Sequence, residues 1–194
     1  EWLDHYPVGR WRSVWEAAYP RPYAGVVATE AKRQSLPEAW AYAIMREESA
    51  FDPRVVSPAK AFGLMQLISP TAKNMAGPLG LPWDDESLKK PEVNIALGCR
   101  YLTVLRGQFP DSPLLAIPGY NAGGGAPKKW LDQRPTDDFD FWVERIPYEE
   151  TRLYTKRVMT SMTAYEFLYA REKASEARST PMAVSPAARA AATP

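Results

Sequence analysis

The chain has 194 residues, a formal net charge of +1 from Lys+Arg 24 and Asp+Glu 23, and 45% hydrophobic residues. This length suggests one domain with appendages, and the balanced charge argues against a strongly basic nucleic-acid-binding protein. A single cysteine, Cys99, excludes an intrachain disulfide and a cysteine zinc cluster, and a single histidine, His5, disfavours histidine triads and histidine-ligated metals. We therefore expect proton chemistry from carboxylates, tyrosine or lysine, with no metal and no cofactor.

The two ends of the chain differ in composition from its middle. In residues 1–30, Trp11, Val14 and Trp15 allow one short amphipathic helix, which Pro20 would end. We interpret this as a lead-in segment and as a candidate for the end of a preceding helical domain, since the chain begins without Met. Residues 173–194 contain no aromatic residue and are rich in Ala, Ser and Pro, which predicts a flexible tail.

The middle of the chain, residues 31–172, follows the helical period, and no run alternates with β-branched residues over more than a few positions. Proline followed by an acid, as at Pro37-Glu38 and Pro91-Glu92, is typical of helix starts. No stretch approaches the roughly 18 apolar residues of a membrane-spanning helix, so no integral membrane segment is expected. The sequence predicts a mainly α domain with little or no sheet, and helices at 24–34, 37–50, 70–76, 91–108, 112–117, 127–132 and 149–170.

Two adjacent acids, Glu47 and Glu48, end the mostly apolar helix predicted at 37–50. At about 100° per residue, Glu48 falls near the middle of the apolar face, between Ala41 and Ile44, and Glu47 lies nearer its edge. Burial against apolar side chains raises the pKa of a carboxyl group, as a glycosidase requires of its general acid. The alternative is an exposed or capped glutamate at a fraying helix end.

Three motifs resemble the signature of the soluble lytic transglycosylases, which are bacterial enzymes with a lysozyme-like helical fold that cleave peptidoglycan glycan strands. The first spans residues 44–76 and contains Glu48-Ser49, Phe51-Asp52-Pro53, Ser57-Pro58, Gly63-Leu64-Met65-Gln66 and Thr71-Ala72. The second is Gly119-Tyr120-Asn121-Ala122-Gly123, and the third runs from Glu144 through Ile146-Pro147-Tyr148 and Glu150-Thr151-Arg152 to Tyr154. The resemblance implies a goose-type lysozyme-like fold.

The resemblance implies that Glu48 is the single catalytic acid and base. It would protonate the oxygen leaving N-acetylmuramic acid, and then take the proton of that sugar's 6-hydroxyl as the hydroxyl closes on the anomeric carbon. The product is a 1,6-anhydro sugar, formed without water. Ordinary glycosidases need two carboxylates, but here the substrate's N-acetyl group would cover the cationic carbon.

The remaining matched residues would bind the sugar. Ser57 would contact the peptide-bearing side of muramic acid, and Met65 and Gln66 would line a sugar site. Tyr120 and Asn121 would lie opposite Glu48, with the Tyr120 hydroxyl on the acid or on the acetamido group. Two further positions, with supporting or substrate-binding roles on the same groove, are Glu150 and Tyr154. Some of the aromatic residues, 12% of the chain, would also line this groove, the alternative being that most are core.

Some positions depart from the family pattern, and they leave other functions open. Lys60 stands where Gly is usual, Arg157 where Asn is frequent, and the further departures are Phe62, Ile68 and Gly119. One alternative is a lysozyme-type hydrolase, for which Glu150 is the only distant second carboxylate that the motifs supply, and another is a non-catalytic peptidoglycan-binding scaffold. The leading interpretation is a monomeric lytic transglycosylase acting on glycan strands in the bacterial periplasm or cell envelope.

Overall fold

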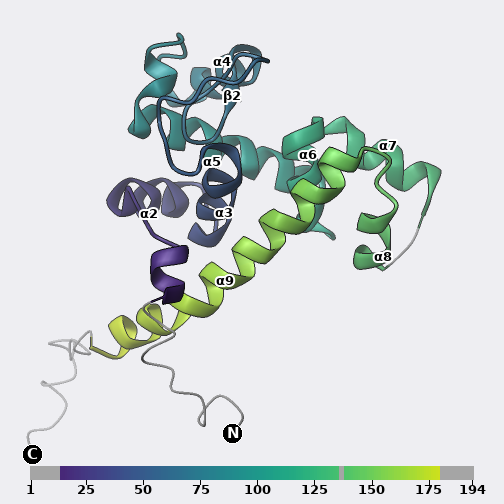
Figure 1. Ribbon diagram of the computed structural model, residues 1–194. Coiled ribbons are helices and arrows are strands. Elements are labelled where there is room, and N and C mark those ends of the chain that lie inside the picture. The colour runs from purple at the N-terminus through teal and green to yellow at the C-terminus, as the bar shows by residue number, and fades with distance from the viewer. Residues whose placement is uncertain (1–13, 136–137, 180–194) are drawn as a thin grey trace, which may run out of the picture.

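The computed structural model describes residues 14–135 and 138–179, which fold into a helical body with one two-stranded antiparallel sheet (Figure 1). This confirms the predicted mainly α fold. After a helical stretch at 14–18, the elements are α2 (Ala24–Arg33), α3 (Glu38–Ser49), β1 (Ala61–Phe62), β2 (Leu67–Ile68), α4 (Ser69–Ala76), η1 (Gly77–Leu79), η2 (Ser87–Lys89), α5 (Pro91–Gln108), η3 (Pro113–Leu115), α6 (Ala116–Ala122), α7 (Gly125–Gln133), α8 (Phe139–Glu144) and α9 (Glu149–Ser179).

Most predicted helices are confirmed to within two residues of their ends, but two differ and one further helix was not predicted. The helix predicted at 112–117 is instead the 3-10 turn η3 followed by α6, which continues to Ala122 because Pro118 lies in its first turn, where proline is tolerated. Helix α8 was not predicted. Helix α9 continues to Ser179, into the segment expected to be a tail, since its last residues are mainly strong helix formers such as Ala, Glu, Lys and Arg.

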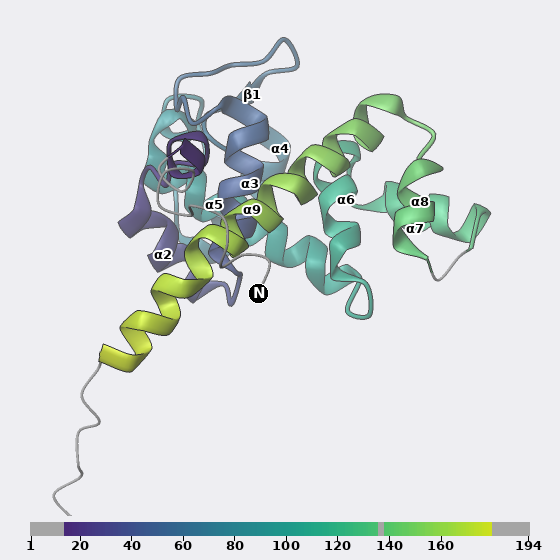
Figure 2. The same cartoon turned by 60° about the horizontal axis from the view of Figure 1, so that its bottom comes forward.

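Helix α3 lies at the centre of the main hydrophobic core. Its residues 39–45 are all buried, and α9 packs along it as well as along α6 (Figures 1 and 2). A helix that is apolar over most of its circumference requires neighbours on several sides. In this fold α2, α5 and α9 supply them, so the end of α3, with its two glutamates, is held rigidly by the core.

The described part of the lead-in segment packs on the body. The Tyr165 and Tyr169 hydroxyls on α9 donate to the carbonyls of Pro20 and Tyr19, at 2.9 and 2.7 Å. The Arg46 guanidinium lies 4.4 Å from the centre of the Tyr19 ring. Helix α2 spans the expected boundary at residue 30 and buries Val27 in the core. Trp2 and Trp11, like residues 180–194 of the expected tail, lie outside the described residues.

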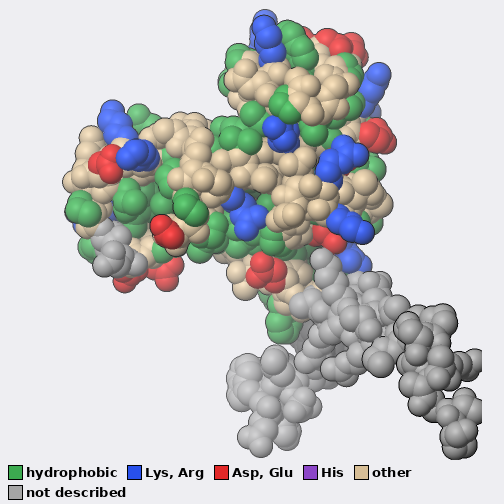
Figure 3. Space-filling model, turned by 180° about the vertical axis from the view of Figure 1, so that it is seen from behind, with side chains coloured by type: hydrophobic (Ala, Val, Ile, Leu, Met, Phe, Trp, Pro, Cys, Tyr) green, Lys and Arg blue, Asp and Glu red, His purple; other side chains and the backbone are tan. Residues whose placement is uncertain are grey.

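A smaller hydrophobic cluster joins α7 and α8 beside the start of α9. Each of its members exposes less than a tenth of its surface, and they are Leu115, Trp130, Trp142, Val143 and Ile146. On the face seen in Figure 3, basic and acidic side chains are interspersed between apolar ones. None of the helices within 14–135 and 138–179 combines the length and apolar character that a membrane crossing requires.

Candidate active site

Glu48 lies in the last turn of α3, where the chain turns sharply into the loop that leads to β1. Ala50 and Phe51 adopt left-handed backbone angles, with φ of 47° and 68°, which are uncommon for residues other than glycine. The buried Ser49 hydroxyl holds this turn by donating to the Leu64 carbonyl at 2.8 Å and accepting from the Phe51 amide at 3.1 Å. These two hydrogen bonds tie the end of α3 to the start of the loop, at Phe51, and to its far part, at Leu64, and so fix the backbone beside Glu48.

The Glu48 carboxyl group is half-buried and accepts a hydrogen bond of 2.7 Å from the Tyr154 hydroxyl to its Oε1 atom. Burial raises the pKa of Glu48 to about 7, opposed by the Tyr154 hydrogen bond and assisted by the charges of Glu47 and Glu150. A carboxylic acid with a pKa near neutrality can both donate and accept a proton at that pH. Glu48 therefore has the properties required of a general acid and base.

The neighbouring Glu47 is engaged differently. Its Oε2 atom lies 2.7 Å from Arg157 Nε in an ion pair, and the Ser161 hydroxyl lies 3.5 Å from its Oε1 atom. A guanidinium beside a carboxylate balances its charge and fixes its position through a charge-assisted hydrogen bond. The two adjacent carboxyl groups are thus in distinct environments, and Glu48 remains the candidate catalytic acid.

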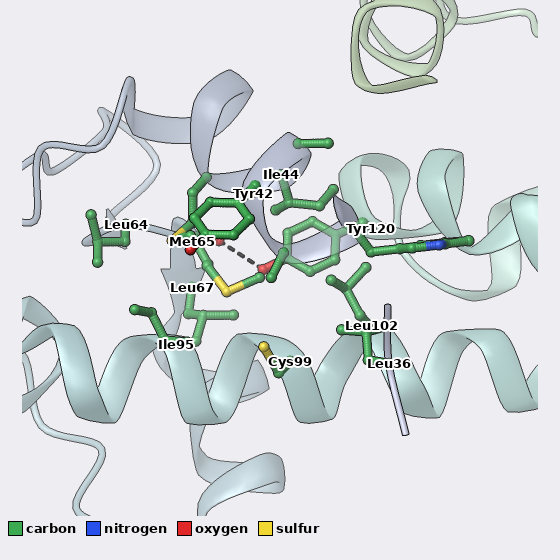
Figure 4. Packing of buried hydrophobic residues seen from close by; sticks show 14 of the residues in the cluster. Leu36, Tyr42, Ile44, Leu64, Met65, Leu67, Ile95, Cys99, Leu102 and Tyr120 are labelled. Atoms are coloured by element: carbon green, nitrogen blue, oxygen red, sulfur yellow. Dashed lines mark hydrogen bonds between the residues drawn. The ribbon is translucent and has the colours of Figure 1, made fainter. Parts of the chain in front are cut away.

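Tyr120 does not contact the acid directly. Its hydroxyl donates to the Met65 carbonyl at 2.8 Å, and its ring lies in the core above Cys99 of α5 (Figure 4). Of the two contacts expected for this hydroxyl, the one with Glu48 is not made, because the phenol on the acid is Tyr154; the one with the acetamido group stays a prediction. Burial raises the pKa of Tyr120, so the ring is a neutral hydrogen-bond donor.

Met65 was expected to line a sugar site, but its side chain has no exposed surface. It packs against Gly98 of α5 so closely that a Cβ atom there would lie 2.3 Å from the Met65 sulfur. The side chain is part of the core, and the residue serves the site through its backbone. Its amide donates to the Asn94 Oδ1 atom at 2.7 Å, and its carbonyl accepts from Tyr120.

Ser57 and Gln66 lie in the loop between α3 and α4. The Ser57 hydroxyl accepts from the Ala61 amide at 3.1 Å, closing a turn in which Lys60 has a left-handed φ of 57°. This explains why glycine suits position 60 better than Lys. The Gln66 Nε2 atom donates to the carbonyls of Val55 and Gly63, at 3.0 and 2.9 Å, so its amide oxygen is the group left for a ligand.

Asn121 and Glu150 approach the site from α6 and α9. The Asn121 Oδ1 atom accepts a 2.6 Å hydrogen bond from the Thr151 hydroxyl, which leaves its amide nitrogen to donate. The Glu150 side chain is exposed and lies one turn before Tyr154 on α9, so both are on the same helix face. Its charge acts on Glu48 and raises the pKa of that acid.

Sequence reasoning missed the buried Asn94, which supports this loop from α5. Its Nδ2 atom donates to the carbonyls of Phe62 and Leu88, at 2.8 and 2.7 Å, and its Oδ1 atom accepts from the Met65 amide. An asparagine within the apolar run from Val93 to Leu97 was a visible signal, because a buried amide must find partners. Among the described residues, no group of three His, Cys, Asp or Glu side chains could hold a metal ion.

Residues 25–143, more than half of the chain, match the family model described as Transglycosylase SLT domain. The chain therefore belongs to this family. It is 38% identical over 152 residues to a putative soluble lytic murein transglycosylase of Haemophilus influenzae, covering 77% of this chain and 25% of that protein. It is 34% identical over 155 residues to the soluble lytic murein transglycosylase of Escherichia coli K12, covering 78% and 24%.

Solved structures confirm the lysozyme-like transglycosylase fold that the resemblance implied. The chain is similar to the 70 kDa soluble lytic transglycosylase of Escherichia coli, with a TM-score of 0.74 and 33% identity over 79% of this chain and 25% of that one. It is equally similar to an inactive variant of Pseudomonas aeruginosa Slt, with a TM-score of 0.74 and 37% identity over 78% and 25%. The chain thus spans about a quarter of the length of these relatives.

Proposed function

We propose that this domain is a lytic transglycosylase that cleaves the β-1,4 bond between N-acetylmuramic acid and N-acetylglucosamine in peptidoglycan. The observation that carries the proposal is Glu48, a half-buried acid with a pKa raised to about 7 and a single phenol on its Oε1 atom. The names of the relatives support the substrate class. One structural neighbour is an inactive variant with a single glutamate replaced by glutamine, which supports a mechanism based on one glutamate.

In the first step Glu48 acts as the acid. Its carboxyl proton moves to the glycosidic oxygen, the bond to the anomeric carbon of muramic acid breaks, and the N-acetylglucosamine side leaves with that proton. The raised pKa keeps a large fraction of Glu48 protonated near pH 7, where an ordinary glutamic acid would be almost fully ionised.

In the second step the Glu48 carboxylate acts as the base. It takes the proton of the muramic acid 6-hydroxyl while that oxygen bonds to the anomeric carbon, which closes the 1,6-anhydro ring and restores the acid. The Tyr154 hydroxyl favours the charged form by donating to it, so it stabilises the carboxylate between the two steps.

The polar groups around Glu48 provide the substrate contacts that we propose. No hydrogen bond within the described residues engages the Gln66 amide oxygen or the Asn121 amide nitrogen, so these atoms can bind sugar hydroxyl or acetamido groups. Ser57 and Glu150 extend the contacts along the loop and α9. Met65 and Tyr120 act indirectly, through the hydrogen bond that positions the loop.

A hydrolase would require a second carboxylate to activate water. Glu47 is committed to Arg157, and Glu150 is exposed, which supports the route in which the substrate's own hydroxyl is the nucleophile. If water replaced that hydroxyl as the nucleophile, the product would have a reducing end instead of an anhydro end.

The decisive experiment incubates the protein, and separately its Glu48→Gln variant, with purified sacculi, and measures the released muropeptides by mass spectrometry. We expect anhydro-muropeptides, lighter by one water than hydrolysis products, and a loss of about a thousandfold or more in the variant. Reducing muramic acid ends alone would establish hydrolysis. Equal release by both proteins would exclude Glu48 as the acid, and no release by either would favour the scaffold.

The proposed substrate locates the domain in the bacterial cell envelope, where the periplasmic glycan strands lie. We propose that it acts as a monomer without a cofactor, and that residues 31–172 form the catalytic unit, on which the part of α2 before residue 31 packs. Residues 1–30 would then be the lead-in and 173–194 the tail of this unit.

A further inference from the structure

An ion pair beside the candidate acid joins the two helices that form the site. Glu47 is in the last turn of α3, and Arg157 is on α9, one turn after Tyr154. Arg157 Nε lies 2.7 Å from Glu47 Oε2, and the Glu47 side chain is 14% exposed. Tyr154, Arg157 and Ser161 recur at helical spacing, so one face of α9 contacts both adjacent glutamates of α3.

Two carboxylates in the last turn of a helix are electrostatically unfavourable, because the carbonyl end of the helix is itself negative. Glu47 and Glu48 are adjacent, and the charge of Glu47 disfavours the charged form of Glu48. The guanidinium of Arg157 compensates one of these charges. A catalytic Glu48 that must alternate between its neutral and charged forms therefore has a neighbour whose charge is already balanced.

We propose that the Glu47–Arg157 ion pair is a positioning device for the reaction of Glu48, holding α9 on the end of α3 and cancelling the charge of Glu47. Arg157 is the position at which this chain departs from the asparagine frequent in the family. The pair thus assigns a role to that departure, one that rests on the proposed function of Glu48.

The groups that face Glu48 come from three elements. Glu47 is on its own helix, Tyr154 and Glu150 approach from α9, and Tyr120 approaches from α6. Burial is the largest cause of the raised pKa, the Tyr154 hydrogen bond lowers it, and the charge of Glu47 raises it. Among the ion pairs of the described residues, Arg157 is the only cation that compensates the charge of Glu47.

The experiment titrates the Glu48 carboxyl carbon by ¹³C NMR in the full chain, at low ionic strength, with Glu48→Gln to assign the signal. Arg157→Asn leaves the Glu47 charge uncompensated, and we expect the Glu48 pKa to rise by about half a unit. Glu47→Gln leaves a cation and removes an anion, so the Glu48 pKa should fall by about as much. In the double variant, the Glu48 pKa should be close to that in the unaltered protein.

A matched control is Lys156→Asn, which removes a cation from the adjacent position of α9. Lys156 pairs with Glu144 at 2.6 Å and does not contact Glu47. We expect no change in the Glu48 pKa and an unchanged pH profile of sacculus digestion. In Arg157→Asn, the alkaline limb of that profile should move to higher pH together with the NMR titration, and about 1 M salt should reduce the shift.

Opposite shifts in the two single variants and their cancellation in the double variant would support the proposal. Shifts in the same direction, or none, with only a lower stability to heat, would overturn it and leave a purely structural ion pair. Because the NMR titration requires no turnover, it tests the ion pair even where the unaltered protein releases no anhydro product, the result that would overturn the proposed function instead.

Discussion

The two sides of Glu48 are held in place by different means. On the loop side, residues 50–68, buried polar groups of Ser49, Asn94 and Tyr120 bond to backbone carbonyls and amides. On the helix side, residues 150–161 of α9, side chains bond to side chains: Tyr154 to Glu48, and Arg157 to Glu47. The first arrangement fixes the shape of an irregular segment, and the second adjusts the proton affinity of the acid.

This difference follows from secondary structure. A loop with short strands and left-handed residues at positions 50, 51, 60 and 66 leaves many backbone groups unpaired, and buried ones must be satisfied by side chains. A helix satisfies its own backbone, so its side chains are available for the chemistry. We therefore expect changes on the loop side to reduce stability and changes on the helix side to alter the pH dependence of activity.

The largest effect on stability should come from Asn94→Ala, which breaks the loop side. The change leaves the Met65 amide and the carbonyls of Phe62 and Leu88 buried without partners, at a cost of about 4 kcal/mol in the free energy of unfolding. Urea denaturation measures this. Asn74→Ala, at an exposed position of α4, should change it by less than about 0.5 kcal/mol. A similarly small loss for Asn94 would show that the amide does not hold the loop.

The next effect is a gain in stability from Glu48→Gln at alkaline pH. The pKa of Glu48 is raised to about 7 in the folded protein from an ordinary 4.5, so its ionisation destabilises the fold progressively as the pH rises from about 4.5 to 7. We expect Glu48→Gln to stabilise the protein by up to about 3 kcal/mol more at pH 8 than at pH 4. Denaturation of both proteins at pH 4 and at pH 8 provides an internal control. If the variant and the unaltered protein differed in unfolding free energy by the same amount at the two pH values, the raised pKa would be contradicted.

Tyr154→Phe, on the helix side, should change the stability least of these three variants and act mainly on the pH dependence of activity. Removing the hydroxyl leaves the ring packing in place but takes away the hydrogen bond that favours the Glu48 carboxylate, so the Glu48 pKa should rise by about one unit. We expect activity near pH 7 to fall about tenfold. The control is Tyr169→Phe, also on α9, which removes a hydroxyl that bonds to the Tyr19 carbonyl. It should leave the pH profile unchanged.

Local patterns predicted much of this protein. The apolar run of α3 and its acid on the core face predicted a buried helix with a buried glutamate, because helical periodicity is set by neighbours in the chain. Proline and acidic starts located α3 and α5. The motifs identified the family, and two of their residues, Ser57 and Gln66, lie between α3 and α4, in the loop that follows Glu48.

Local patterns failed where contacts between distant segments decide the outcome. The existence of α8 depends on packing around Trp130 and Trp142, and α6 is buried by the main core through Ala116, Ile117 and Tyr120. Met65 is a core residue because Gly98, 33 positions later, leaves room for its sulfur. The choice between Tyr120 and Tyr154 as partner of the acid likewise depends on contacts between distant segments, because α9 packs along α3 while the Tyr120 hydroxyl of α6 bonds to the loop at Met65.

The sequence alone determined that few groups other than carboxylates were available for proton chemistry, since the chain has one histidine and one cysteine, and the motifs then predicted Glu48, at the end of an apolar helix, as the catalytic acid. Only the tertiary structure decided which groups surround that carboxylate. Burial by the core raises the pKa of Glu48, and α9, more than 100 residues later, supplies the phenol on Glu48 and the guanidinium on Glu47. Proton affinity depends on distance through space, which position along the chain does not give.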